Sequence, residues 1–198
     1  MKKLLCALLS ILVLLFFASC GSDGNAGKTA TPSVFFDVRG EADGSYSIGY
    51  YYIDDPVIIP ERISGHDITC ISLEAFQYND LTAVTMHDNI KVIMPEAFRY
   101  CRRLEKVDLG HGVEKIQSMA FASCDALESI TIPSSVKEIG SYAFDETAAL
   151  KTVRFEGNAP KVDYLIFGEP REDLTIYYKS GTTGWDNKYL SQYKLVEE

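Results

Sequence analysis

The sequence has no cluster of basic residues. Its 198 residues include 19 Lys and Arg against 28 Asp and Glu, which gives a formal net charge of −9. Nucleic acids and anionic membrane surfaces attract proteins with basic patches. The acidic balance therefore argues against both, and we expect no nucleic-acid partner and no membrane contact beyond an N-terminal lipid.

Motifs of catalysis are also missing. The chain has no serine elbow, no zinc-binding helix motif, no Gly-rich phosphate loop and no Cys/His nucleophile pair. Its three histidines, His66, His87 and His111, are scattered along the sequence. A metal pair of His87 and His111 is an alternative, but their registers in the repeat differ by one residue, which favours solvated surface side chains. We predict no enzyme activity, no catalytic residues, no cofactor and no metal site.

Only one long apolar run occurs, at Leu4–Ala18. It is shorter than the roughly 20 residues that a helix needs to cross a bilayer, and it is typical of a targeting leader. Phe17-Ala18-Ser19-Cys20 resembles a bacterial lipobox, which implies cleavage before Cys20 and lipidation of that cysteine. An ordinary secretory signal with a chance cysteine is the alternative. We assign 1–19 to a lipoprotein signal peptide and 20–33, rich in Gly, Ser and Thr, to a flexible tether.

The mature part of the chain repeats itself four times. Each copy carries an Ala-Phe pair, and the pairs recur in steps of 22, 23 and 23 residues: Ala75-Phe76, Ala97-Phe98, Ala120-Phe121 and Ala143-Phe144. An apolar frame surrounds every pair; in the third copy it is Val113, Ile116, Cys124, Leu127, Ile130 and Ile132. Self-similarity at this period is the signature of stacked repeats. We predict a repeat solenoid with four repeats at 68–158.

The spacing within a copy predicts two walls. Ile130 and Ile132 alternate with Ser129 and Thr131, so the isoleucines should point inward and the polar residues outward. Val113 and Ile116 form a shorter element on the opposite wall, and the Ala-Phe pair lies in the turn between the walls. No copy contains a helix-length periodic run. The expected fold is therefore β-rich with short helical turns, and about five strands should stack, each ~4.8 Å from the next.

Both ends of the array need covers, because an open solenoid end exposes apolar surface and strand edges. Residues 34–67 are interpreted as an N-terminal β-hairpin cap, with a turn at Asp43-Gly44, followed by the first strand at Val57-Ile58. Residues 159–198 are interpreted as a degenerate repeat and a C-terminal cap. Trp185, the only tryptophan, is expected to lie over the last coil as a lid.

The repeat V-x-x-I-x-x-x-A-F-x-x-C-x-x-L-x-x-I-x-I-P at Val113–Pro133 resembles the BspA-like leucine-rich repeats of bacterial surface proteins. The flanks around Ser64-Gly65 and Gly181–Trp185 are similar to that family as well, so the resemblance covers roughly Val57 to Asn187. It implies a leucine-rich-repeat solenoid. It also implies a function in adhesion and in binding host proteins.

Two cysteines occupy the same register in adjacent copies, Cys101 and Cys124, where Asn79 and Thr147 stand in the other two. A position that accepts Asn, Cys or Thr suits an inward turn residue that satisfies backbone groups. An exported protein also meets an oxidising compartment, so a disulfide between them is the alternative. The sequence leaves both possibilities open.

The outward strand positions are the candidate binding site. They form two ladders on a gently curved, concave face: Ala83, Lys106, Ser129 and Thr152, and beside them Thr85, Asp108, Thr131 and Arg154. Repeat proteins bind partners on such faces, although an ordinary solvated sheet would look the same. The aromatic cap is a rival contact site, since tyrosine is enriched at interfaces: Tyr46, Tyr50, Tyr51 and Tyr52.

Together these features predict an exported, lipid-anchored protein that binds a protein or glycan partner at the cell surface. The absence of Asp after Cys20 favours an outer-membrane lipoprotein exposed at the surface. The alternative is a structural component of the cell envelope that has no external ligand.

Overall fold

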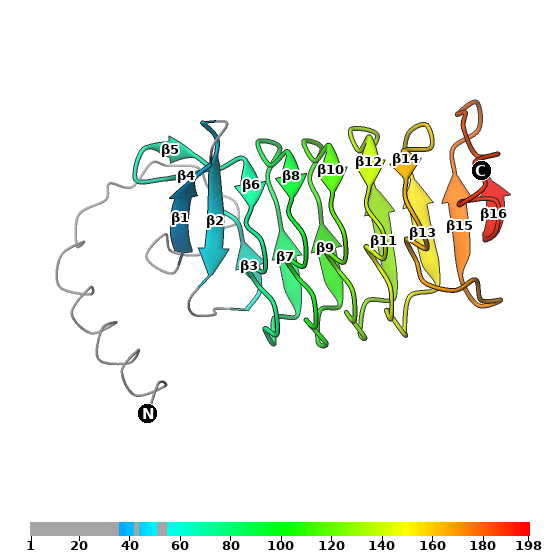
Figure 1. Cartoon of the computed structure of the whole chain (residues 1–198), viewed down its shortest axis with the longest axis horizontal. Helices are drawn as coiled ribbons and strands as arrows, with labels where there is room; N and C mark the ends of the chain where they lie inside the picture. The colour runs from blue at the N-terminus through cyan, green and yellow to red at the C-terminus, as the bar shows by residue number, and fades with distance from the viewer. Residues whose placement is uncertain (1–35, 42–43, 51–54) are drawn as a thin grey trace.

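The computed structural model describes residues 36–41, 44–50 and 55–198. In this part the chain winds into a β-solenoid in which each coil lies beside the next (Figure 1). These residues form strands and turns without any helix, and no span able to cross a membrane occurs among them. The signal peptide, Cys20 and the tether lie outside the described residues and stay predictions.

One wall of the solenoid consists of short strands that pair in parallel from coil to coil. In spatial order it comprises β1 (Phe36–Gly40), β2 (Tyr46–Tyr50), β6 (Cys70–Ile71), β8 (Val92–Ile93), β10 (Lys115–Ile116), β12 (Glu138–Ile139) and β14 (Lys161–Val162). Strands β1 and β2 form the expected antiparallel hairpin, and β2 pairs in parallel with β6. The hairpin is confirmed at the edge of this sheet, while its capping role stays a prediction. Strands β4 (Arg62–Ile63) and β5 (His66–Asp67) form a separate small hairpin.

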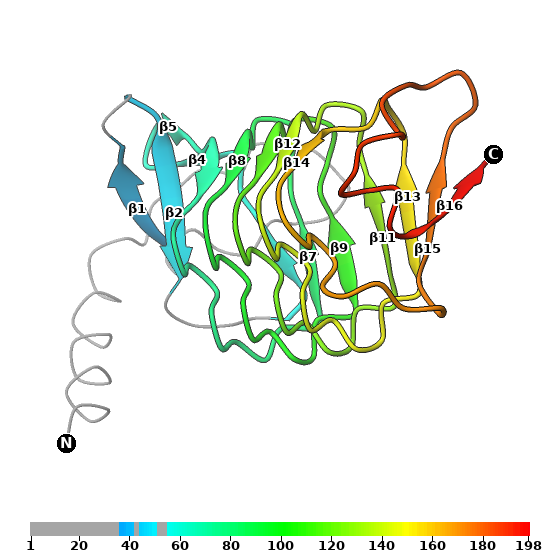
Figure 2. The same cartoon turned by 45° about the vertical axis from the view of Figure 1, so that its right-hand side comes forward.

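The opposite wall carries longer strands, and we call its outward surface the long-strand face. A three-stranded sheet comprises β3 (Val57–Ile58), β7 (Ala83–Thr85) and β9 (Lys106–Asp108). A four-stranded sheet follows with β11 (Ser129–Ile132), β13 (Thr152–Phe155), β15 (Thr175–Tyr178) and β16 (Lys194–Glu197). Figure 2 shows this row separated from the row of short strands.

Two expectations for the long-strand wall were wrong. The wall contains more strands than the about five expected, because β16 pairs in parallel with β15 beyond the residue placed as a lid. The wall is also interrupted, since no ladder joins β9 to β11 in the described chain. The repeat pattern gave no sign of β16, because no Ala-Phe pair precedes it and its apolar content is limited to Leu195 and Val196.

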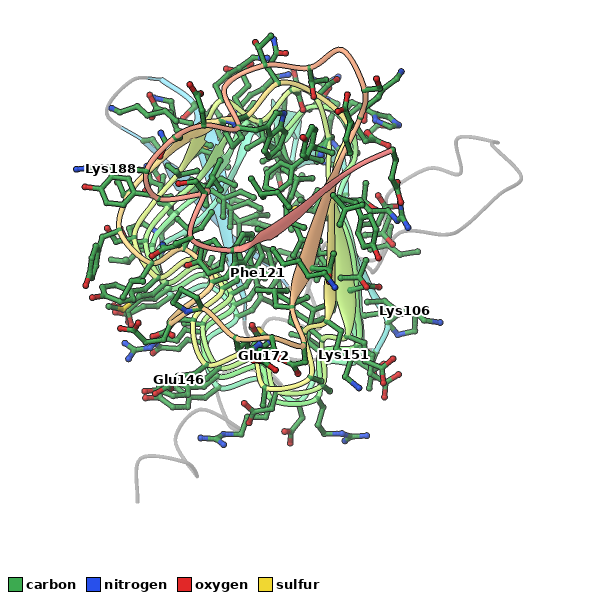
Figure 3. The ribbon with its side chains drawn as sticks, turned by 90° about the vertical axis from the view of Figure 1, so that its right-hand side faces the viewer. Lys106, Phe121, Glu146, Lys151, Glu172 and Lys188 are labelled. Atoms are coloured by element: carbon green, nitrogen blue, oxygen red, sulfur yellow. The ribbon has the colours of Figure 1, made fainter. Side chains whose placement is uncertain are left out.

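A stack of phenylalanine rings fills the space between the walls. Phe76, Phe98, Phe121 and Phe144 are fully buried, and successive ring centroids lie 4.8, 5.0 and 5.3 Å apart with planes within 6° of parallel. Phe167 continues the stack at 5.5 Å. Figure 3, which looks along the solenoid, shows Phe121 in the middle of the coil. Leucine, isoleucine and valine from both walls close around the rings, and this burial is the main stabilising force of the fold.

The Ala-Phe turns are hydrogen-bonded to one another in a ladder of their own. The Phe76 N–H donates to the Ala97 carbonyl at 2.7 Å, and the Phe98 N–H donates to the Ala120 carbonyl at 2.8 Å. Each pair is flanked by residues in the left-handed conformation, such as Glu96 with φ 58° and Tyr100 with φ 62°. Residues other than glycine rarely adopt that backbone conformation. The hydrogen bonds between coils and the ring stack must therefore offset its conformational free energy. The expected close passage of the backbone at the alanine is confirmed, because Ala97 and Ala120 are fully buried.

Cys101 and Cys124 form the buried ladder rather than a bridge. Both are free thiols without exposed surface. The Cys101 Sγ donates to the Phe76 carbonyl at 3.0 Å, and the Cys124 Sγ donates to the Phe98 carbonyl at 3.3 Å. Burial raises the pKa of the Cys101 thiol to about 12 and raises the pKa of Cys124 well above its usual value. Each cysteine therefore ties its turn to the preceding coil in the protonated form.

Two aromatic residues pack near the C-terminal end of the solenoid, and one of them meets the ring stack. Trp185 is 7 % exposed and lies against Phe155 and Tyr178, with centroids 5.1 and 4.6 Å away. Tyr193 meets Phe167 edge to face at 5.5 Å. The Tyr193 hydroxyl accepts from the Phe167 N–H at 3.4 Å and donates to the Gly168 carbonyl at 2.8 Å. It thereby serves backbone groups of the last Ala-Phe-like turn, where the described chain has no further turn of this kind.

The free thiols give a first testable prediction. Alkylation requires the thiolate, so iodoacetamide at pH 8 should leave Cys101 and Cys124 unmodified in the folded protein and should modify both after unfolding without reductant. Peptide mass spectrometry measures the difference. A peptide pair linked through the two cysteines would contradict the thiol ladder.

The terminal tyrosine gives a second prediction. Tyr193→Phe keeps the ring but leaves the Phe167 N–H and the Gly168 carbonyl without this hydroxyl. We expect the free energy of unfolding to fall by about 1–2 kcal/mol, the usual cost of buried polar groups that lose a partner. Chemical denaturation measures it, with Tyr164→Phe as the matched control because Tyr164 is 51 % exposed. An equal loss in both variants would refute the role of the Tyr193 hydroxyl.

Candidate interaction site

The eight outward residues predicted for binding all lie on strands of the long-strand wall. Neighbouring coils pair as expected, with Ala83 opposite Lys106, Thr85 opposite Asp108, Ser129 opposite Thr152 and Thr131 opposite Arg154. Strand β11 shows the alternation plainly, since Ser129 and Thr131 are exposed while Ile130 and Ile132 are buried. The predicted direction is therefore confirmed for the side chains of β11, and binding by the eight residues stays a prediction.

The structure does not bring all eight residues into one sheet. The first four lie on β7 and β9 and the last four on β11 and β13; β9 and β11 lie side by side, but no ladder of strand hydrogen bonds joins them. Lys106 and Arg154, the two cations of the set, therefore belong to different sheets. The candidate site divides into an N-terminal and a C-terminal part.

The C-terminal part is larger than the repeat pattern indicated. Strand β15 places Tyr177 in register with Arg154, and β16 places Val196 in register with Tyr177. The two predicted ladders leave out Tyr177 and Val196, because they comprise only the strands of the four clear repeats. The sequence does predict one more strand at Leu174-Thr175-Ile176, which β15 confirms, and its alternation places Tyr177 outward.

An open hollow of about 540 Å³ lies on this C-terminal part. Its lining includes Thr131, Ser134, Arg154, Glu156, Tyr177 and Lys179. The Arg154 guanidinium lies over the Tyr177 ring, 4.7 Å from its centroid, and forms an ion pair with Glu198. Half-exposed and flat, this guanidinium offers a fork of donors that suits a carboxylate. Tyrosine and arginine are also the side chains that most often dominate protein interfaces.

The histidines form no catalytic arrangement with one another. His66 stacks on Tyr46 at 4.0 Å, and His111 is exposed. The expectation of a solvated side chain was wrong for His87, which is half-buried, accepts from the Asn89 N–H and lies 2.9 Å from the Pro60 carbonyl through Nε2. Burial lowers the pKa of His87, so it is neutral and structural. No three His, Cys, Asp or Glu side chains gather as metal ligands within the described residues.

Solved structures resemble this chain over most of its length. A leucine-rich repeat protein of T. pallidum is 22 % identical with a TM-score of 0.69, covering 86 % of this chain and 84 % of its own. A leucine-rich repeat protein of Bacteroides capillosus is 32 % identical with a TM-score of 0.54, covering 62 % and 95 %. The pneumococcal vaccine antigen PcpA is 17 % identical with a TM-score of 0.58, covering 79 % and 47 %. A comparison with curated proteins gave no match.

The repeat itself matches a family model. Six copies of the BspA type leucine-rich repeat region are recognised across residues 67–193, which is most of the chain. The matched residues form the apolar frame, the parallel ladders and the stacked phenylalanines described above. The chain belongs to the BspA-type leucine-rich repeat family.

Proposed function

We propose that this protein is exported, anchored by lipid at Cys20, and binds a protein partner at the bacterial cell surface through the C-terminal part of the long-strand face. BspA-type proteins are typically bacterial surface proteins, and leucine-rich repeats are typically interaction scaffolds without catalysis. The leader and the lipobox-like sequence at Cys20 support export and anchoring. Adhesion is the role that combines these properties.

The Arg154–Tyr177 pair in the hollow is the observation that carries the proposal. Arg154 lies over an aromatic ring, and its ion pair with Glu198 is exposed on both sides. Exposed ion pairs contribute little to stability. A partner carboxylate can therefore replace Glu198 at small cost and accept from two donors of the guanidinium, while Tyr177 supplies apolar contact. We expect an acidic side chain of the partner at this point.

The face is tested by placing a photo-cross-linking amino acid at exposed Thr131 and irradiating intact cells. We expect a discrete protein adduct that disappears when Arg154→Glu and Tyr177→Ala are combined, because hot-spot residues contribute about 2 kcal/mol or more each. That energy corresponds to a loss of affinity of at least about 30-fold. Mass spectrometry of the adduct identifies the partner.

Lys91, directly before β8 on the short-strand wall, is the matched control. It is charged and half-exposed in an ion pair, as Arg154 is. A cross-linker at position 91 should give no adduct, and Lys91→Glu should leave the adduct at position 131 unchanged. Equal adducts at both positions, or an adduct that survives the double substitution, would refute the assignment of the long-strand face.

Anchoring and exposure make a separate prediction. Cys20→Ser should move the protein from the membrane fraction into the soluble fraction, because the lipid is the only proposed anchor and each buried CH₂ contributes roughly 0.8 kcal/mol. Protease added to intact cells should remove the repeat domain of the unaltered protein, as detected by immunoblot. Protection until the envelope is broken would refute surface adhesion and favour the envelope-component alternative.

A further inference from the structure

Three tyrosines gather on the side of the solenoid away from the long-strand face, and we call them the tyrosine cluster: Tyr142, Tyr164 and Tyr189. The rings of Tyr142 and Tyr164 lie 5.8 Å apart at 82°, and those of Tyr164 and Tyr189 lie 6.4 Å apart at 89°. Lys188 Nζ lies 4.5 Å from the Tyr189 centroid. Figure 3 shows Lys188 and Lys106 on opposite sides of the coil, so this cluster and the long-strand face are separate surfaces.

The fold does not require tyrosine at positions 142 and 164. The Met119 N–H donates to the Ser141 carbonyl, and in the next coil the Tyr142 N–H donates to the Tyr164 carbonyl, so Met119 and Ser141 stand where Tyr142 and Tyr164 stand one coil later. Glu96 occupies the same position as Tyr142 in an earlier coil. Tyr164 is 51 % exposed, whereas most apolar positions of the frame are buried. Packing therefore does not account for the choice of tyrosine at two neighbouring positions.

A hollow of about 230 Å³ lies on the short-strand wall. Its polar lining comprises Lys115, Gln117, Ser118, Glu138, Lys161 and Asp163. None of the three tyrosines lines the hollow, but Asp163 directly precedes Tyr164 in the chain, so the backbone of Tyr164 lies beside it. Gly140 forms part of its floor, where an added Cβ would lie 2.7 Å from the Ser118 nitrogen. The backbones of neighbouring coils thus approach too closely at this point for a side chain.

The charges of this lining balance, unlike those of the whole protein. Two lysines face two carboxylates, and Lys115 is paired with Glu138 at 3.2 Å. Lys161 stands in register with Glu138 on the other side. A polyanion would meet Glu138 and Asp163, and a polycation would meet the lysines. The lining therefore suits a neutral ligand that both donates and accepts hydrogen bonds.

We propose that the hollow and the tyrosine cluster together bind a neutral oligosaccharide. The hydroxyls of a sugar donate to carboxylates and accept from ammonium and amide groups, which are the groups that line the hollow. The C–H groups of a sugar ring pack on the negative face of an aromatic ring. Pockets that enclose drug-sized ligands measure roughly 300–1,000 Å³. This smaller hollow takes one sugar unit, and the next unit of the chain lies over Tyr164.

The same observations disfavour a protein ligand at this place. Protein interfaces concentrate their binding energy in desolvated apolar centres with a polar rim. Here the arrangement differs, because most residues that line the hollow are polar or charged and the aromatic rings lie outside its lining. The proposal is independent of the proposed function, since it uses the other wall of the solenoid.

A glycan array tests the proposal, with the full chain purified in detergent and with printed neutral, sialylated and sulfated oligosaccharides as probes. We expect binding to neutral glycans that falls at least about tenfold in Tyr164→Ala and in Asp163→Ala. A tenfold change corresponds to about 1.4 kcal/mol. Tyr164→Phe, which keeps the ring, should retain most of the signal. Circular dichroism confirms that each variant is folded.

Two matched controls separate this site from other surfaces. Tyr78→Ala removes a tyrosine that is 70 % exposed elsewhere on the solenoid, and Arg154→Ala alters the long-strand face; both should leave glycan binding unchanged. The absence of any bound neutral glycan, binding to acidic glycans alone, or equal losses in Tyr78→Ala and Tyr164→Ala would overturn the proposal. Since none of these results depends on a protein partner, the proposed function stands or fails separately.

Discussion

The contact between successive Ala-Phe turns is the constraint on which the rest of the structure depends. A strand of two residues, such as β8 or β10, cannot hold a wall by itself. The turn ladder fixes each coil at hydrogen-bonding distance from the next, and that spacing also sets the rings of Phe98 and Phe121 5.0 Å apart. Parallel strands on both walls then meet in register as a consequence. Ala at the first position admits the neighbouring backbone and Phe at the second fills the space between walls, although Ile166 stands in place of the alanine in the last such turn.

The repeat frame made the core predictable because every inward position recurs. A position that recurs in four coils, such as the one filled by Asn79, Cys101, Cys124 and Thr147, has the same local environment each time. That environment requires a small group bonded to a turn carbonyl, and Cys101 and Cys124 provide it as thiols. The sequence left a disulfide open because adjacent coils also bring equivalent residues close together. Whether the two cysteines are buried as free thiols or joined as a disulfide depends on how the coils pack, and the spacing of the repeat does not reveal it.

What the frame could not predict lies where the repetition ends. Strand β16 extends the four-stranded sheet without an Ala-Phe pair, since Tyr193 replaces the next phenylalanine edge to face and its hydroxyl serves the last turn. The left-handed residues around each pair were equally hidden, because glycine usually marks that conformation and most of these positions carry Glu, Tyr, Met or Ser. The interruption between β9 and β11 has no counterpart in the sequence, whose coils are equal in length there. Because of this interruption, the residues of the candidate site lie in two sheets, whereas the two predicted ladders place them in one.

The outward positions are where function can vary without cost to the fold. Substitutions on the long-strand face and at the tyrosine cluster lie on opposite sides of the phenylalanine stack, and distant sites that share no partners contribute nearly additively to stability. Each surface can therefore acquire its own ligand while the frame stays the same. The arginine over a tyrosine ring on one wall and the balanced charges on the other are different chemistries on one solenoid. A small solenoid of this kind is suited to hold two unlike ligands at once, because neither site needs the other to form.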